Sequence, residues 1–261
     1  MQAGPRKTRS AIRLSRADLE AHHFLAFHLQ APAVLRADWA AQLQAQLSLD
    51  DLQAYRSMLA PMRQDEFLVG RALLRLVLGA LLKIAPAEVR LSRSMCGKPQ
   101  LDDVPTPPVW FNLAHSRQHL LLAVSQHGLV GADIELIGGY KARLARRFFH
   151  PDEVALLEWL SPLQRPDAFY HLWTAKEACI KALGLGLHFP LREVQLSLSE
   201  HGAWHDLRWR MLPGPARAKA AVAIAQRSAP LIVRPALIQW IDFASLLSAS
   251  LRSTSSQTIS V

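Results

Sequence analysis

Two short acidic segments, one expected on a strand and one on a helix, constrain how this chain can fold. The pattern of Leu129 to Leu136 predicts a β-strand, on which Asp133 and Glu135 are two residues apart and so lie on one face. Glu177 falls within Asp167 to Leu183, which has the pattern of a long helix. Converging carboxylates are typical ligands of Mg²⁺, so we expect this strand and helix to meet at a metal site.

Each acidic segment also has a plainer interpretation. Asp133 and Glu135 could form the wet face of an edge strand, while Glu177 and Lys181 could form a surface ion pair one helical turn apart. Trp173 lies one turn before Glu177 on the same face, which favours a partly covered surface such as a cleft wall. From these residues alone both interpretations stay open.

The overall composition favours acidic partners. The chain has 261 residues, of which 50% are hydrophobic, and 30 Lys plus Arg stand against 21 Asp plus Glu, giving a net charge of +9. Such a chain can bury the core of one or two domains and attract nucleic acid, a membrane surface, a nucleotide-like cofactor or an acidic protein. The segment Trp204 to Arg210 could stack on nucleic acid, but it alternates like a strand, so we interpret it as structural.

Targeting and redox signals are weak. No apolar run approaches the length of a spanning helix, and the basic N-terminus lacks the apolar core of a signal peptide. Cys96 and Cys179 have no metal-ligand spacing and suit a reducing compartment. We therefore expect a cytoplasmic protein without a membrane anchor.

The order of the expected elements predicts an α+β fold. Helices are expected at Asp38–Leu47, Leu49–Leu59 (ended by Pro61), Asp65–Ile84, Lys141–Phe149, Pro151–Leu160 and Asp167–Leu183. Strands are expected at Glu88–Ser92, Val109–Leu113, Leu120–Ser125, Leu129–Leu136, Val194–Leu198, Trp204–Met211, Ala220–Ala225 and Ala236–Ile241, the last four in an antiparallel sheet. We divide the chain into halves, 14–127 and 128–246, with disordered tails at 1–13 and 247–261.

Two basic side chains sit where they could meet a phosphate. Lys98 lies in a stiff Gly97-Lys98-Pro99 turn, and His115 follows an apolar strand beside Ser116. A single Lys or His is more often a surface or structural residue, so both interpretations remain open for Lys98 and His115.

Five segments, taken in order, resemble the long, surfactin-synthetase-activating type of 4′-phosphopantetheinyl transferase. They are Gly97-Lys98-Pro99, Phe111-Asn112-Leu113-Ala114-His115-Ser116, Gly131-Ala132-Asp133-Ile134-Glu135, Arg146-Arg147-Phe148-Phe149 and the helical segment with Trp173, Lys176, Glu177, Ala178 and Lys181. The resemblance covers roughly residues 49–222. It implies two similar α+β halves that form a pseudo-dimer, with coenzyme A in the cleft between them.

The resemblance also implies roles for the acidic and catalytic residues. Asp133, Glu135 and Glu177 would hold Mg²⁺ on the coenzyme A pyrophosphate. Lys181 would stabilise charge on the reacting phosphate, and Glu177 would accept the proton of the attacking hydroxyl.

Coenzyme A contacts are implied elsewhere. Lys98 and His115 would bind its phosphates and Pro99 would shape the adenine pocket. Arg71 and Arg75 on the long helix are candidates for the nucleotide phosphate, although Arg75 could equally be an exposed helix residue. Two positions depart from the family pattern: Ala114 replaces a frequent Ser or Thr, and Gly184-Leu185-Gly186 replaces Gly-Lys-Gly.

The expected reaction moves phosphopantetheine from coenzyme A to a serine of an apo acyl or peptidyl carrier protein and releases 3′,5′-adenosine bisphosphate. The expected protein is a monomer that binds neither nucleic acid nor membrane. Alternatives are a relative that binds coenzyme A or carrier without transfer, a basic nucleic-acid-binding protein, and a Mg²⁺-dependent phosphodiesterase.

Overall fold

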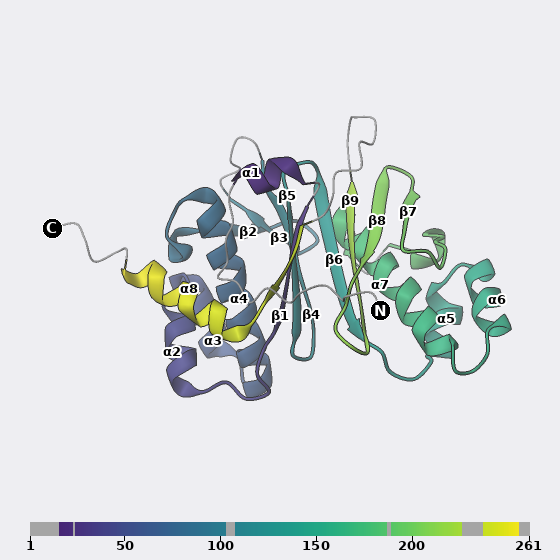
Figure 1. Ribbon diagram of the computed structural model, residues 1–261, viewed down its shortest axis with the longest axis horizontal. Helices are drawn as coiled ribbons and strands as arrows, with labels where there is room; N and C mark the ends of the chain where they lie inside the picture. The colour runs from purple at the N-terminus through teal and green to yellow at the C-terminus, as the bar shows by residue number, and fades with distance from the viewer. Residues whose placement is uncertain (1–15, 23, 103–107, 187–188, 226–236, 256–261) are drawn as a thin grey trace, which may run out of the picture.

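The computed structural model describes residues 16–22, 24–102, 108–186, 189–225 and 237–255. It has an α+β architecture in four layers: helices, a four-stranded sheet, a second four-stranded sheet, and helices again (Figure 1). Among these residues no helix is both long and apolar enough to cross a membrane.

The first sheet has the strand order β10-β1-β5-β4 and is covered on its outer face by the long helix α4 (Figure 1). β5 runs antiparallel to both β1 and β4, whereas β10 runs parallel to β1. The bounds are Leu25–Gln30 for β1, Trp110–Ser116 for β4, His119–Ser125 for β5, Leu237–Ile241 for β10 and Pro61–Leu82 for α4.

The second sheet is antiparallel throughout, in the order β6-β9-β8-β7, and α7 packs on its outer face. Its strands are β6 (Leu129–Leu136), β7 (His201–Trp204), β8 (Leu207–Leu212) and β9 (Ala218–Ala225). The helices on this side are α5 (Ala142–Phe148), α6 (Pro151–Trp159) and α7 (Arg165–Leu183).

Shorter elements complete the described chain. They are the helices α1 (Arg16–Ala21), α2 (Ala37–Gln44), α3 (Leu49–Ser57) and α8 (Phe243–Ser255), the strands β2 (Leu91–Arg93) and β3 (Pro99–Leu101), which form a hairpin, and the 3₁₀ turns η1 (Pro86–Glu88) and η3 (Leu191–Glu193).

Alternating side chains on the strands divide the interior into three apolar clusters. On β1, Leu25, Phe27 and Leu29 pack toward α4, whereas Ala26 joins the cluster between the sheets. The cluster between the sheets is rich in alanine and valine, which lets the two sheets approach closely.

β6 has the alternation that the sequence predicts. Val130, Ala132 and Ile134 are fully buried between the sheets. The alternate residues Gly131, Asp133 and Glu135 therefore lie on the face toward α7. The prediction that both carboxylates share one face, opposite Ile134, is confirmed.

Several expected elements differ from the structure. The long helix α4 begins at Pro61, four residues before the expected start at Asp65. Proline is tolerated at this first position, because the N–H that it lacks would have no partner within the helix and its φ already suits a helix. Val194 to Leu198 is not a strand, because two of its backbone groups bind side chains instead: Val194 O accepts from Lys176 and Leu196 N donates to Glu153. Trp204 to Met211 is not one strand: Trp204 ends β7 and Leu207 begins β8, with His205 in the turn between them at φ +50°.

The C-terminal boundaries also need correction. The expected second half, 128–246, includes β10, which pairs with β1 of the first sheet instead. The expected disordered tail from residue 247 forms helix α8 through Ser255. This helix is held because Leu246 is buried in the first core and Ser250 O accepts a hydrogen bond from Gln46 Nε2 at 3.2 Å. The N-terminal tail, 1–13, lies outside the described residues.

Candidate functional site

The acidic site forms where β6 and α7 pack directly against each other. A Cβ built on Gly131 would lie only 2.1 Å from Ala178 O and 2.2 Å from Ala182 N, so the absence of a side chain allows this contact. The strand brings Asp133 and the helix brings Lys181 to within 2.5 Å, measured between Asp133 Oδ1 and Lys181 Nζ. Strand and helix motifs that are distant in the sequence thus share one site.

This geometry removes the plainer interpretation of the helix motif. Glu177 is only 7% exposed, and the ion pair of Lys181 is with Asp133 on β6. Asp133 is 4% exposed, which also rules out the wet face of an edge strand for this carboxylate. The motif residues therefore face the strand and not open solvent.

Burial raises the pKa of all three carboxyl groups. Burial raises the pKa of Glu177 to about 7, and it raises that of Asp133 despite the opposing charge of Lys181. Burial and the neighbouring Asp133 raise the pKa of Glu135. For Lys181, burial is the largest single influence and lowers the pKa, but the ion pair with Asp133 and the charges of Glu177 and Glu135 together raise it. The site thus holds more carboxylates than its lysine can neutralise.

The carboxylates fit a hard cation chemically. Asp133 Oδ2 and Glu177 Oε1 are buried and have no hydrogen-bond partner among the described residues, which is costly for oxygens of this kind. As the side chains stand, no group of three or more His, Cys, Asp or Glu in the described chain is arranged to hold a metal. Lys181 occupies one oxygen of Asp133 in this arrangement.

A pocket of about 530 Å³ brings together three of the residues expected to contact coenzyme A. Arg71 from α4, Pro99 from β3 and His115 from β4 all line it. Arg63 and Phe67 line it too and were missed, although Arg63, Phe67 and Arg71 recur every fourth residue on α4 and so share a face. Ser116, which follows His115 on β4, donates to Glu135 Oε2 at 3.1 Å, so the pocket adjoins the acidic site.

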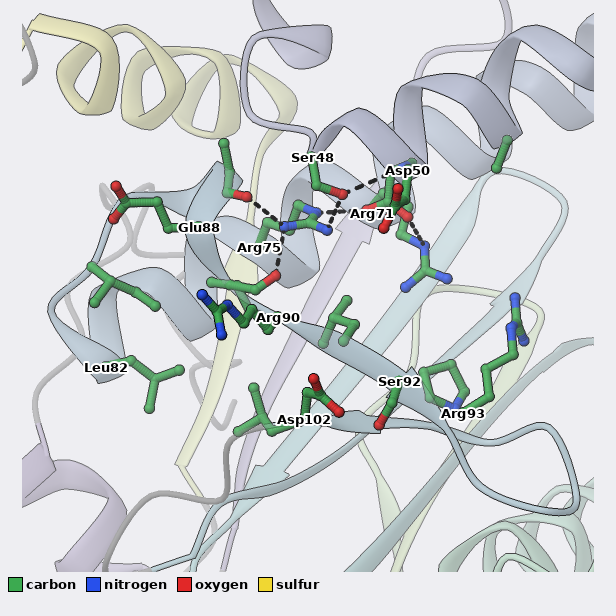
Figure 2. A pocket seen from close by; sticks show the side chains of 18 of the residues that line it. Ser48, Asp50, Arg71, Arg75, Leu82, Glu88, Arg90, Ser92, Arg93 and Asp102 are labelled. Atoms are coloured by element: carbon green, nitrogen blue, oxygen red, sulfur yellow. Dashed lines mark hydrogen bonds and ion pairs between the residues drawn. The ribbon is translucent and has the colours of Figure 1, made fainter.

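A larger neighbouring pocket, of about 1000 Å³, shares Arg71 and Pro99 with the first (Figure 2). Arg90 and Arg93 line it as well, and the sequence did not single them out. Burial lowers the pKa of Arg71, which Asp51 partly offsets from 3.5 Å. Arg71 thus stands on the wall between two pockets.

Arg75 also lines the larger pocket, and its side chain is buried, so it is not an exposed helix residue. Its guanidinium pairs with Asp51 at 2.6 Å and donates to Ser48 Oγ at 2.6 Å (Figure 2). It also donates to the carbonyls of Pro86 at 3.0 Å and Val89 at 2.8 Å. Since the side chain is buried and its donors already meet protein oxygens, Arg75 joins α3, α4 and η1.

Lys98 lies at the C-terminal end of α7, away from the pocket of Arg71 and His115. Its ammonium donates to the carbonyls of Lys181 at 2.5 Å, Val130 at 2.9 Å and Ala182 at 3.3 Å. Burial lowers its pKa to about 8. A cation on the last carbonyls of a helix is favourable, so in this arrangement Lys98 ties the β2–β3 hairpin to β6 and α7.

The remaining aromatic motif residues belong to the core. Trp173 stacks on Phe169 and meets Phe148 and Phe149 edge-on or tilted, with ring centroids about 6 Å apart. Trp209 is buried against α7, so the structural interpretation of Trp204 to Arg210 is confirmed for that residue.

Comparison with known proteins identifies the family. A model of the 4′-phosphopantetheinyl transferase superfamily matches residues 129–220, which run from β6 to β9. The 4′-phosphopantetheinyl transferase HetI of Nostoc is 36% identical over 160 residues, which are 60% of this chain and 67% of HetI. This chain belongs to the 4′-phosphopantetheinyl transferase superfamily.

Two further phosphopantetheinyl transferase relatives show how far the match extends. A Synechocystis relative, slr0495, is 37% identical over 153 residues, or 58% of this chain and 62% of its own length. The 4′-phosphopantetheinyl transferase Sfp of Bacillus subtilis is 29% identical over 168 residues, or 60% of this chain and 74% of Sfp. A substantial part of each relative therefore lies outside the match.

Asp133, Glu135, Glu177 and Lys181 all fall within the segment that matches the phosphopantetheinyl transferase model. The two departures from the family pattern have different surroundings. Ala114 is buried in the apolar cluster between the sheets, whereas Leu185 is 39% exposed after α7.

Proposed function

We propose that this chain transfers 4′-phosphopantetheine from coenzyme A to a serine hydroxyl of an apo carrier protein and releases 3′,5′-adenosine bisphosphate. The observation that carries the proposal is the convergence of Asp133, Glu135, Glu177 and Lys181 where β6 meets α7, in a chain of this superfamily. The adjoining pocket of Arg71, Pro99 and His115 supports a polyanionic nucleotide as the donor.

Asp133, Glu135 and Glu177 would hold Mg²⁺, since a hard cation prefers carboxylate ligands and a buried oxygen of Asp133 and one of Glu177 lack partners among the described residues. When bound, the ion would neutralise pyrophosphate charge. Arg71 and His115 would hold the phosphates of coenzyme A and Pro99 would border its base. In this proposal Arg75 supports the larger pocket through Asp51, which lines it, and Lys98 holds the β2–β3 hairpin against β6 and α7.

Residues of the chain would then accept the proton of the serine hydroxyl and stabilise the charge on the reacting phosphate. The serine oxygen forms a new bond to the phosphorus that carries pantetheine, while the bond from that phosphorus to the bridging oxygen breaks. Glu177 on α7 would take the hydroxyl proton. Lys181 would stabilise negative charge on the reacting phosphate.

The arrangement of the chain fits a pseudo-dimer. Each half would contribute a four-stranded sheet and one long helix, α4 or α7, and the coenzyme would lie between the halves. We propose a cytoplasmic monomer, with the net charge of +9 directed at coenzyme A and an acidic carrier and not at nucleic acid.

Mass spectrometry tests the proposal. An apo carrier protein incubated with this protein, coenzyme A and Mg²⁺ should gain the mass of one phosphopantetheine group, and a carrier with its acceptor serine replaced by alanine should gain none. Asp133→Ala should abolish the gain while the protein stays folded, because the variant removes a carboxylate at the centre of the site. Near-wild-type transfer by Asp133→Ala at saturating Mg²⁺ would remove this residue from the site.

The two helix residues give a second prediction. Glu177→Gln and Lys181→Ala should each lower turnover by roughly 10²-fold or more, the scale of a lost proton acceptor or charge-stabilising group. Initial rates at saturating coenzyme A and carrier check this, with melting temperatures measured in parallel. A changed melting temperature with unchanged turnover would mean that Glu177 and Lys181 serve only the packing of α7 on β6.

A further inference from the structure

β6 is an edge strand whose outer backbone groups are bound by side chains of the first half. In the second sheet β6 pairs only with β9, so alternate residues turn their N–H and C=O groups toward β4. Val130 O accepts from Lys98 Nζ at 2.9 Å, and Ala132 N donates to Asn112 Oδ1 at 2.8 Å. Leu136 N donates to Ser116 Oγ at 3.3 Å.

Of these three side chains, Ser116 is the one for which the described residues show a second hydrogen bond to a carboxylate of the acidic site. Its hydroxyl donates to Glu135 Oε2 at 3.1 Å while its oxygen accepts from Leu136 N. A serine hydroxyl has a single hydrogen, so the bond to the backbone amide leaves that hydrogen directed at the carboxylate.

The backbone around Ser116 fixes the position of this hydroxyl. Ser116 is the last residue of β4 and pairs with His119 of β5, so only two residues form the turn between them. The first of these, Arg117, has φ +52°, as short hairpin turns require. The Glu135 side chain is long and rotates about three bonds, so ordering it costs more conformational entropy than ordering a short side chain. A hydrogen-bond partner offsets part of this cost.

We propose that Ser116 is a positioning residue, which orients the Glu135 carboxylate for cation binding from the opposite sheet. The inference rests on the proposed function, in which Glu135 is a ligand of Mg²⁺. Ser116 fixes one carboxylate oxygen, Oε2, and leaves the other for the cation. Residues that orient metal ligands in this way typically contribute about 10–100-fold to metal affinity.

The test uses a matched pair of variants. Ser116→Thr and Ser116→Val have side chains of the same shape that both suit a strand, but only Thr keeps the hydroxyl. The dissociation constant for Mn²⁺ is measured by electron paramagnetic resonance in the presence of coenzyme A, together with the Mg²⁺ concentration that gives half-maximal transfer. Ser116→Val should raise the Mn²⁺ dissociation constant and the half-maximal Mg²⁺ concentration by about 10-fold or more. In Ser116→Thr both values should stay within about 3-fold of those of the wild type.

Asn112→Ala is the control for loss of a β6 edge contact. It removes the hydrogen bond to Ala132 N, so it should lower the melting temperature. Because Asn112 also lines the pocket of Arg71 and His115, the measurement uses saturating coenzyme A, and the Mn²⁺ dissociation constant should then be unchanged. Equal Mn²⁺ affinity in the Val and Thr variants, equal weakening by Asn112→Ala, or no Mn²⁺ binding by wild type would each overturn the inference. A wild type that binds Mn²⁺ in this pattern but transfers nothing would overturn the proposed function and leave the role of Ser116 intact. An active enzyme in which the Ser116 variants did not differ in Mn²⁺ affinity would support the proposed function and overturn the role of Ser116.

Discussion

Gly131→Ala should destabilise the folded protein by about 3 kcal/mol or more, at or above the upper end of the usual cost of overpacking. The added methyl group would lie 2.1 Å from Ala178 O and 2.2 Å from Ala182 N. Both are backbone atoms of α7, so no side chain can rotate away to relieve the clash. The strand and helix must separate, and Asp133 moves away from Lys181 as they do. Transfer should therefore be lost together with stability.

Two other glycines provide graded controls in urea unfolding. A Cβ at Gly139 would meet nothing within 4 Å, so Gly139→Ala should be close to neutral. A Cβ at Gly70 would lie 3.2 Å from the flexible ends of Leu113 and Leu120. The loss of stability in Gly70→Ala should therefore lie between that of Gly139→Ala and that of Gly131→Ala. If Gly131→Ala unfolded at the same urea concentration as Gly139→Ala, β6 would not need its direct contact with α7.

Lys176→Met should lower the free energy of unfolding by about 3–5 kcal/mol, the usual cost of leaving a buried charge without its partner. Lys176 is fully buried and pairs with Glu153 at 2.6 Å. Its ammonium also donates to the carbonyls of Leu191 and Val194. Among the described residues, the variant leaves the buried Glu153 carboxylate with two backbone amides as partners, those of His150 and Leu196.

An exposed ion pair supplies the comparison. Arg146 and Glu158 lie 3.0 Å apart at the surface, so Arg146→Met should change the free energy of unfolding by less than about 1 kcal/mol. Chemical denaturation of both variants measures the difference. Combining Lys176→Met with Glu153→Leu should cost less than the sum of the two single changes, because the second removes the orphaned charge. Strict additivity would show that Lys176 and Glu153 stabilise the fold independently.

The core of the candidate site could be predicted because it depends on local periodicity. The two-residue period of a strand puts Asp133 and Glu135 on one face, and the helical period puts Glu177 and Lys181 on another. The strand itself was predicted with its observed bounds. Periodicity says nothing about which faces meet, so the expected contact between the two faces came from the chemistry of three carboxylates that suit one cation and from the family resemblance.

Partners that are distant in the sequence were not predictable from local patterns. Arg75 was expected near a ligand or in solvent, but its partners come from α3 and from the segment after α4. Lys98 was expected at a phosphate, yet in the structure it binds backbone carbonyls. Every residue has a backbone carbonyl, so the sequence does not show which of them a lysine will bind. The segment Val194 to Leu198 alternates like a strand, and only the burial of Lys176 and Glu153 explains why it is not one.

The parallel pairing of β10 with β1 has a consequence for how the protein forms in the cell. β1 ends at Gln30 and β10 at Ile241, so the ribosome must add roughly 200 residues between them. At a usual synthesis rate this takes about 10–40 s. During that interval β1 has an unpaired edge, which is a template for pairing with other chains. Premature termination anywhere before β10 would therefore yield chains that associate through β1, even if the second sheet and its acidic site had already folded.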